Sequence, residues 1–121
     1  MRIVTLVLLG LMALEHVYFL YLEMFRWTAP RTIKAFKTTA AVAESSKKLA
    51  MNQGLYNGFL AAGLIWAIVA PPPLQRPLAI FFASCVLVAG VFGGMTVTRR
   101  ILVIQALPAA LALISVFAFG I

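Results

Sequence analysis

Four long apolar stretches dominate the chain, and they cover residues 3–25, 49–70, 78–97 and 101–120. Each stretch meets the length of roughly 20 mostly apolar residues that a helix needs to cross ~30 Å of hydrocarbon. The apolar positions are continuous, whereas a membrane β-strand would alternate apolar and polar residues. The pattern therefore predicts an all-α integral membrane protein, a four-transmembrane-helix bundle that forms a single membrane domain over residues 1–121.

Proline residues mark the expected helix ends. The run Pro71–Pro73 cannot continue the second helix, because each proline lacks an N–H group and clashes with the preceding turn. Pro77 is expected in the first turn of the third helix, where a missing N–H costs no hydrogen bond. Pro108 lies inside the fourth helix, so we expect a kink there and an unpaired backbone carbonyl near Ile104.

Composition agrees with a membrane location. Of the 121 residues, 64% are hydrophobic and 11% are charged, whereas a soluble domain has about half and about a quarter. The single cysteine excludes a disulfide scaffold. The net charge of +7 does not indicate nucleic-acid binding, because the Lys and Arg residues lie between apolar stretches rather than over one polar face.

The distribution of Lys and Arg predicts the orientation in the membrane. The linker at 26–48 contains six of them and the last turn contains Arg99 and Arg100, whereas Arg2 and Arg76 lie on the opposite side. Cytoplasmic loops carry the excess of Lys and Arg. We therefore expect a multi-pass protein of the bacterial inner (plasma) membrane with both termini on the non-cytoplasmic side.

The linker itself carries a pattern. Thr28-Ala29-Pro30 is typical of a helix start, and Ile33, Phe36 and Ala40 then follow at helical spacing beside basic residues. This predicts a short amphipathic helix at the anionic cytoplasmic leaflet. A solvated connector whose charges only set the topology remains the alternative.

Polar residues inside the apolar stretches are the candidate functional residues. At 1.5 Å per residue they all fall in the cytoplasmic half of the bilayer or near its midplane. This depth pattern predicts a polar cavity that opens toward the cytoplasm. The candidate cavity and ligand-binding residues are Glu15, His16, Glu23, Asn52, Gln53, Tyr56, Asn57 and Gln105.

Each of these residues also has a purely structural interpretation. Asn and Gln in membrane helices often form hydrogen bonds between helices, and Glu23 could form an ion pair with Arg26 one turn away. Glu15 differs, because His16 is the only possible cation within reach on its helix. A carboxyl group at mid-membrane usually faces protein or water and has a partner. We therefore interpret Glu15 as functional, and no catalytic residue is assigned.

We expect no metal or other cofactor, because three or four convergent ligands are needed and the chain offers one His, one distant Cys and two carboxyl groups in reach. The expected partners are the lipid bilayer and a small-molecule or lipid ligand. The pairs Gly54/Gly58 and Gly90/Gly94 permit close helix approach, either within the chain or in a parallel homo-oligomer.

Several motifs together resemble a known family. They are Ala13–His16, Tyr21–Trp27, Asn52–Gly63 and Gln105–Ala109. These runs are similar to a family of small bacterial membrane proteins catalogued as domain of unknown function 1304 (DUF1304). The resemblance implies a four-helix inner-membrane protein and supplies no activity, ligand or catalytic residue. A looser similarity links Glu15 to the helix-one glutamate of small multidrug resistance transporters, by position only, since the flanking motifs differ.

Three functions fit these features. The first is small-molecule binding and transport with Glu15 as a proton- or substrate-linked carboxyl group. The second is a membrane-embedded acid–base enzyme that acts on a lipid-like substrate through Glu15 and His16. The third is a structural or accessory subunit whose polar residues only hold helices together.

Overall fold

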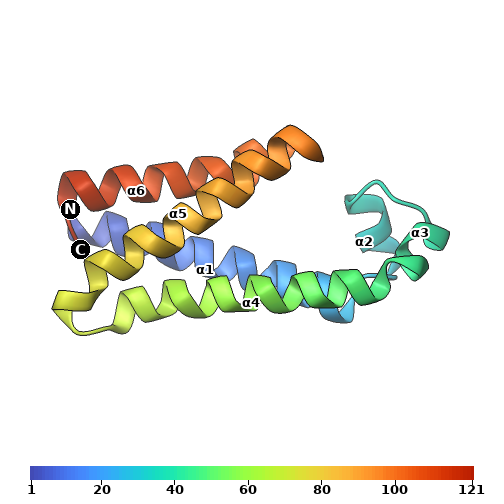
Figure 1. The fold of residues 1–121 in the computed structure, drawn as a ribbon, viewed down its shortest axis with the longest axis horizontal. Helices are drawn as coiled ribbons and strands as arrows, with labels where there is room; N and C mark the ends of the chain where they lie inside the picture. The colour runs from blue at the N-terminus through green and yellow to red at the C-terminus, as the bar shows by residue number, and fades with distance from the viewer. The chain divides into compact units, whose positions relative to one another are not determined.

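A computed structural model describes residues 1–121, and it is helical without β-strands, which confirms the all-α prediction. Its elements are α1 (Arg2–Phe25), α2 (Pro30–Ala35), α3 (Ala40–Ser45), α4 (Lys47–Val69), α5 (Pro72–Thr96), the π-helical η1 (Leu102–Ala106) and α6 (Leu107–Phe119) (Figure 1). The chain forms two compact units: unit 1 comprises Met1–Leu14 and Leu60–Ile121, and unit 2 comprises Glu15–Phe59. Both α1 and α4 contribute to each unit.

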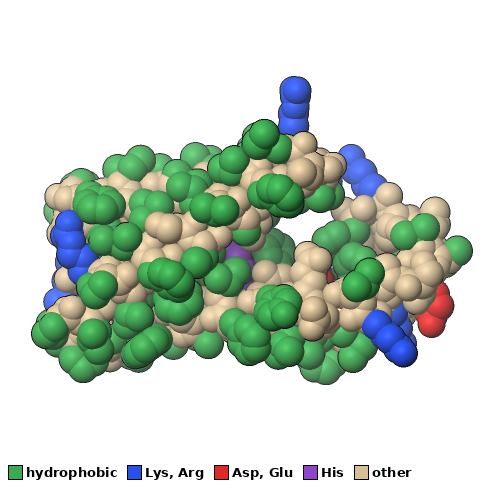
Figure 2. Space-filling view, in the orientation of Figure 1, with side chains coloured by type: hydrophobic (Ala, Val, Ile, Leu, Met, Phe, Trp, Pro, Cys, Tyr) green, Lys and Arg blue, Asp and Glu red, His purple; other side chains and the backbone are tan.

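Three helical segments are long and apolar enough to cross a membrane, namely Arg2–Phe25, Pro72–Thr96 and Leu102–Phe119. Large apolar side chains on them are exposed, and hydrophobic side chains are spread over the visible face in Figure 2. Such a surface suits hydrocarbon rather than water. These helices indicate a membrane protein. The helix α4 also has 23 residues, but Lys47, Lys48 and three amide side chains in its first half reduce its hydropathy.

Small residues build the core of unit 1. Ala67, Ala79, Ala83, Ala109 and Ala112 are fully buried, and they come from α4, α5 and α6. Larger side chains that complete this core are Leu9, Met12, Leu64, Val86 and Val116. Small side chains let helix backbones approach closely. In hydrocarbon, which is as apolar as the side chains, helices associate through such close packing rather than through the hydrophobic effect.

The junction of α4 and α5 differs in part from the prediction. The helix α4 ends at Val69, directly before the prolines, as expected. The prediction that the third helix begins near residue 78 is wrong, because α5 begins at Pro72 and Pro77 lies inside it. Pro72 and Pro73 occupy the first turn, where no N–H is needed. The Gln75 side chain stabilises this turn by donating to the Ile68 carbonyl at 2.7 Å.

The irregularity expected at Pro108 takes the form of a π-helical turn. The Leu107 N–H donates to the Leu102 carbonyl, and regular α-helix resumes with Pro108 in its first turn. This wide turn packs against α5 at Gly90. A Cβ at Gly90 would lie 2.5 Å from the Ala106 nitrogen, so the close approach requires glycine.

The linker contains two short helices rather than one. Lys37 adopts a positive φ of 51°, which ends the first helix, and the Thr39 hydroxyl begins the second by accepting from the Val42 N–H at 3.2 Å. The predicted face of Ile33, Phe36 and Ala40 is therefore wrong, because Phe36 and Ala40 lie outside α2. A left-handed residue between them breaks the periodicity.

Trp27, near the start of the linker, contacts residues in its middle and near its end. Its indole Nε1 donates to the Ser46 hydroxyl at 3.1 Å, and its ring meets Phe36 edge to face at 5.0 Å. These contacts join the end of α1 to α2 and to the start of α4, so they fix the linker within unit 2.

We predict that Gly90→Ala lowers the free energy of unfolding by about 1–3 kcal/mol, because the new methyl group meets backbone atoms of Ala106. Gly10→Ala is the matched control: a Cβ there has nothing within 4 Å, and alanine favours helix more than glycine does. Unfolding in detergent, followed by circular dichroism, measures both variants. Equal stabilities would contradict the close packing at Gly90.

Candidate functional site

One face of α1 carries Glu15 and, beyond it, three residues that line a pocket in unit 2. Glu15, Tyr18, Leu22 and Arg26 lie within about 80° of one another around the helix axis at 100° per residue. The Arg26 N–H still donates to the Leu22 carbonyl at 3.1 Å, so the helical register reaches Arg26. A single stripe therefore runs from the end of α1 back to Glu15.

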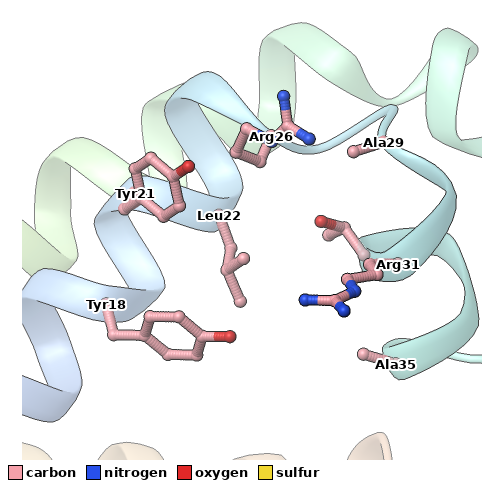
Figure 3. A pocket seen from close by; sticks show the side chains of 8 residues that line it. Tyr18, Tyr21, Leu22, Arg26, Ala29, Arg31 and Ala35 are labelled. Atoms are coloured by element: carbon pink, nitrogen blue, oxygen red, sulfur yellow. The ribbon is translucent and has the colours of Figure 1, made fainter.

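The pocket has a volume of about 290 Å³. It is lined by Tyr18, Tyr21, Leu22, Arg26, Ala29, Arg31, Thr32 and Ala35. The Tyr18 hydroxyl and the Arg31 guanidinium point into the same space from α1 and α2 (Figure 3). Two tyrosines, two arginines and a buried threonine give this pocket hydroxyl and guanidinium groups beside the apolar side chains of Leu22, Ala29 and Ala35.

Glu15 lies one helical turn beyond the pocket. Its position three residues before Tyr18 places both side chains on the same side of α1. The Glu15 side chain is half-buried, and no other side chain of the protein donates a hydrogen bond to its carboxyl group. An acceptor of this kind inside an apolar helix is available to water or to a ligand.

Glu23 lies on a different face and has a structural role. It is 3% exposed, and its carboxyl group accepts a hydrogen bond from Nδ2 of Asn57 on α4. Gly54 allows this approach, since a Cβ there would lie 3.1 Å from the Glu23 Cβ and 2.6 Å from Cγ of Met24. The expected ion pair with Arg26 is replaced by this interhelical hydrogen bond, and Arg26 lines the pocket instead.

The other predicted site residues are dispersed. His16 is fully buried and meets the Phe19 ring edge to face at 5.6 Å. Asn52, Gln53 and Tyr56 are exposed on α4. Gln105 is half-buried in η1, within unit 1. None of the eight predicted residues lines the pocket of unit 2.

The sequence prediction did not include the pocket residues. Tyr18 and Tyr21 lie inside the first apolar stretch but were not among the predicted residues, and Arg26, Arg31 and Thr32 belong to the linker. The available signal was the helical spacing of Tyr18, Leu22 and Arg26. Only the folding of α2 brings Arg31 to that stripe. No group of three His, Cys, Asp or Glu side chains is close enough to hold a metal ion.

Comparison with known proteins identifies the family. The sequence profile of a family described as a protein of unknown function (DUF1304) matches residues 10–117. The chain belongs to the DUF1304 family. It is also similar to the uncharacterized protein YpaA of Lactococcus lactis subsp. lactis (strain IL1403), with 36% identity over 119 residues, which are 97% of this chain and 99% of the relative. No solved structure matches the chain.

We predict that Asn57→Ala lowers the free energy of unfolding by about 1–3 kcal/mol, because it leaves the buried Glu23 carboxyl group without its donor. Asn52→Ala is the control on the same helix and changes stability by less than about 0.5 kcal/mol, because Asn52 is exposed. Thermal unfolding in detergent compares the two variants. A similar small effect for both would contradict a structural role for the Glu23–Asn57 bond.

Proposed function

We propose that the protein spans the bacterial plasma (inner) membrane four times, through α1, α4, α5 and the segment formed by η1 and α6, with both termini outside. Within unit 1 the two chain ends lie near the junction of α4 and α5 (Figure 1). Arg2 donates to the Gln75 side chain at 2.8 Å, and the Thr5 and Ser115 hydroxyls are 2.6 Å apart. Ends that meet on one side of a helical protein support an even number of crossings.

The charges support this orientation. In this orientation the cytoplasmic side carries eight basic residues: Arg26, Arg31 and four lysines of the linker, together with Arg99 and Arg100. Cytoplasmic loops of membrane proteins carry the excess of Lys and Arg. The 23 residues of α4 span about 35 Å at 1.5 Å per residue, enough for ~30 Å of hydrocarbon. The hydrogen bond between Glu23 and Asn57 pairs two polar side chains, which would otherwise enter the hydrocarbon without a hydrogen-bond partner.

We expect an alkaline phosphatase domain fused after Ile121 to be active outside the cytoplasm, because the charge bias places the C-terminus there. A fusion within the linker, after Lys37, is expected to be inactive, and a fluorescent protein at the same site is expected to fold and fluoresce. The reverse activities would refute the orientation.

We infer that the protein binds a small polar molecule from the cytoplasm and carries it across the membrane. The observation that supports this most directly is the continuous face from the pocket to Glu15. A charge at the membrane centre costs about 2.5–3.5 kcal/mol, so a carboxyl group without a partner in the chain needs water, a proton or a ligand. Glu15 is then the group at which a proton or a polar part of the substrate is exchanged.

The enzyme alternative finds less support. Acid–base chemistry requires two titratable groups that reach the same reacting atom. Glu15 and His16 are adjacent residues about 100° apart on α1, and His16 is fully buried whereas Glu15 is half-exposed. For Glu23 and Asn57 the structural interpretation is preferred, because they bind one another.

We predict that Glu15→Gln abolishes substrate movement while the protein remains folded. Purified protein in liposomes is supplied with a defined mixture of polar metabolites, and accumulation is measured by mass spectrometry. Wild type is expected to accumulate at least one compound above protein-free liposomes, and Glu15→Gln is expected to fall to that background, because the amide cannot exchange a proton.

Glu44→Gln is the matched control, since it makes the same chemical change at an exposed position on α3 and is expected to transport normally. Circular dichroism verifies that each variant is helical. Full transport by Glu15→Gln would remove Glu15 from the mechanism, and accumulation no higher than in protein-free liposomes for wild type would reject transport of these compounds.

A further inference from the structure

We propose that the pocket of unit 2 binds a phosphate group, carried either by an anionic lipid headgroup or by a small phosphorylated molecule in the cytoplasm. This inference rests on the proposed function, because it names the ligand class of the same pocket. The residues that recognise the phosphate are Tyr18, Tyr21, Arg26, Arg31 and Thr32.

The charge of the pocket selects an anion. Arg26 and Arg31 both line it, and no carboxyl group is among the lining residues. Of the protein's three glutamates, Glu23 is bound to Asn57, Glu44 is exposed on α3 and Glu15 lies one helical turn beyond the pocket. The pocket lining therefore has two guanidinium groups and no carboxylate. Such a lining repels a cation and attracts an anion.

The donor set favours phosphate over a carboxylate. Guanidinium groups bind phosphate oxygens through paired N–H donors in a fixed plane. Here the Arg31 guanidinium on α2 points into the same space as the Tyr18 hydroxyl, and Arg26 lines the pocket from the end of α1 (Figure 3). Tyr21 and Thr32 add two more hydroxyls. A tetrahedral anion with several acceptor oxygens can use donors from these different directions, whereas a planar carboxylate has only two oxygens.

The linker holds these donors in place. Pro30 fixes the backbone immediately before Arg31, and Thr32 is 3% exposed, so the first turn of α2 packs against the rest of unit 2. The Trp27 contacts with Ser46 and Phe36 fix both ends of this segment. A site whose donors are already positioned loses less entropy on binding.

Size and place agree with a headgroup or a small phosphorylated compound. A volume of about 290 Å³ lies near the lower limit of ligand pockets, which measure about 300–1,000 Å³. In the proposed topology the pocket lies where α1 leaves the membrane at the cytoplasmic leaflet. Anionic lipid headgroups concentrate there, and basic pockets beside membrane helices bind them.

The experiment measures how the whole chain binds two compounds that carry phosphate. For the lipid, the protein is taken from nanodiscs with equal amounts of phosphatidylglycerol and phosphatidylcholine, and native mass spectrometry identifies the lipid that it retains. For the soluble compound, isothermal titration in neutral detergent measures the binding of glycerol 3-phosphate. For whichever probe binds, Arg31→Gln is expected to lower the affinity by about tenfold or more, because charged hydrogen bonds are lost. Tyr18→Phe removes one hydroxyl and is expected to lower the affinity by less.

Two controls match these variants. Lys34→Gln removes the same charge from α2 outside the pocket, and Tyr56→Phe removes a hydroxyl from an exposed position on α4, so both are expected to bind as wild type does. Preferential retention of phosphatidylglycerol that Arg31→Gln abolishes identifies a lipid source, and binding of glycerol 3-phosphate with the same dependence identifies a soluble one.

Other outcomes overturn the proposal. If wild type binds neither probe, the pocket is not a phosphate site. If Lys34→Gln weakens binding as much as Arg31→Gln does, the attraction is a general effect of surface charge. Transport of an unphosphorylated compound that depends on Glu15 would leave the proposed function standing without this ligand class, so the two failures are distinguishable.

Discussion

A polar side chain within an apolar helix needs a polar partner, because hydrocarbon supplies none. The helix α1 meets this requirement in two ways. Glu23 is buried and accepts a hydrogen bond from Asn57, which joins α1 to α4. Glu15 accepts none from the chain and lies on the face that leads to a cationic pocket. Two carboxyl groups eight residues apart therefore belong to different environments, one with a hydrogen-bond donor from α4 and one without a donor from the chain.

Close helix packing makes the Glu23–Asn57 bond possible, and it also builds unit 1. Gly54 brings α4 within reach of Glu23, and Gly90 brings the π-helical turn against α5. Alanine does the same in the core of unit 1. In a protein whose outer surface is apolar, these small residues supply the contact area that a soluble domain obtains by burying large side chains. The glycine pairs noted in the sequence therefore mediate contacts within the chain.

Local signals predicted most of the fold. The ends of α1 at Phe25 and of α4 at Val69 follow from charge and from the proline run, both of which act on neighbouring residues. The start of α5 at Pro72 was missed, because a proline run can end one helix and also begin the next. The single linker helix was wrong, because the periodicity gave no sign of the left-handed backbone at Lys37.

The sequence by itself determined an all-helical membrane protein, the approximate helix ends and the polar residues that need partners, since these depend on length, hydropathy and local backbone chemistry. The tertiary structure alone decided which partners they have. Asn57 reaches Glu23 across 34 residues, and Arg31 joins Tyr18 only because α2 folds back beside α1. Such pairings depend on how helices pack around one another. The helical periodicity of one segment does not indicate which other segment packs against it.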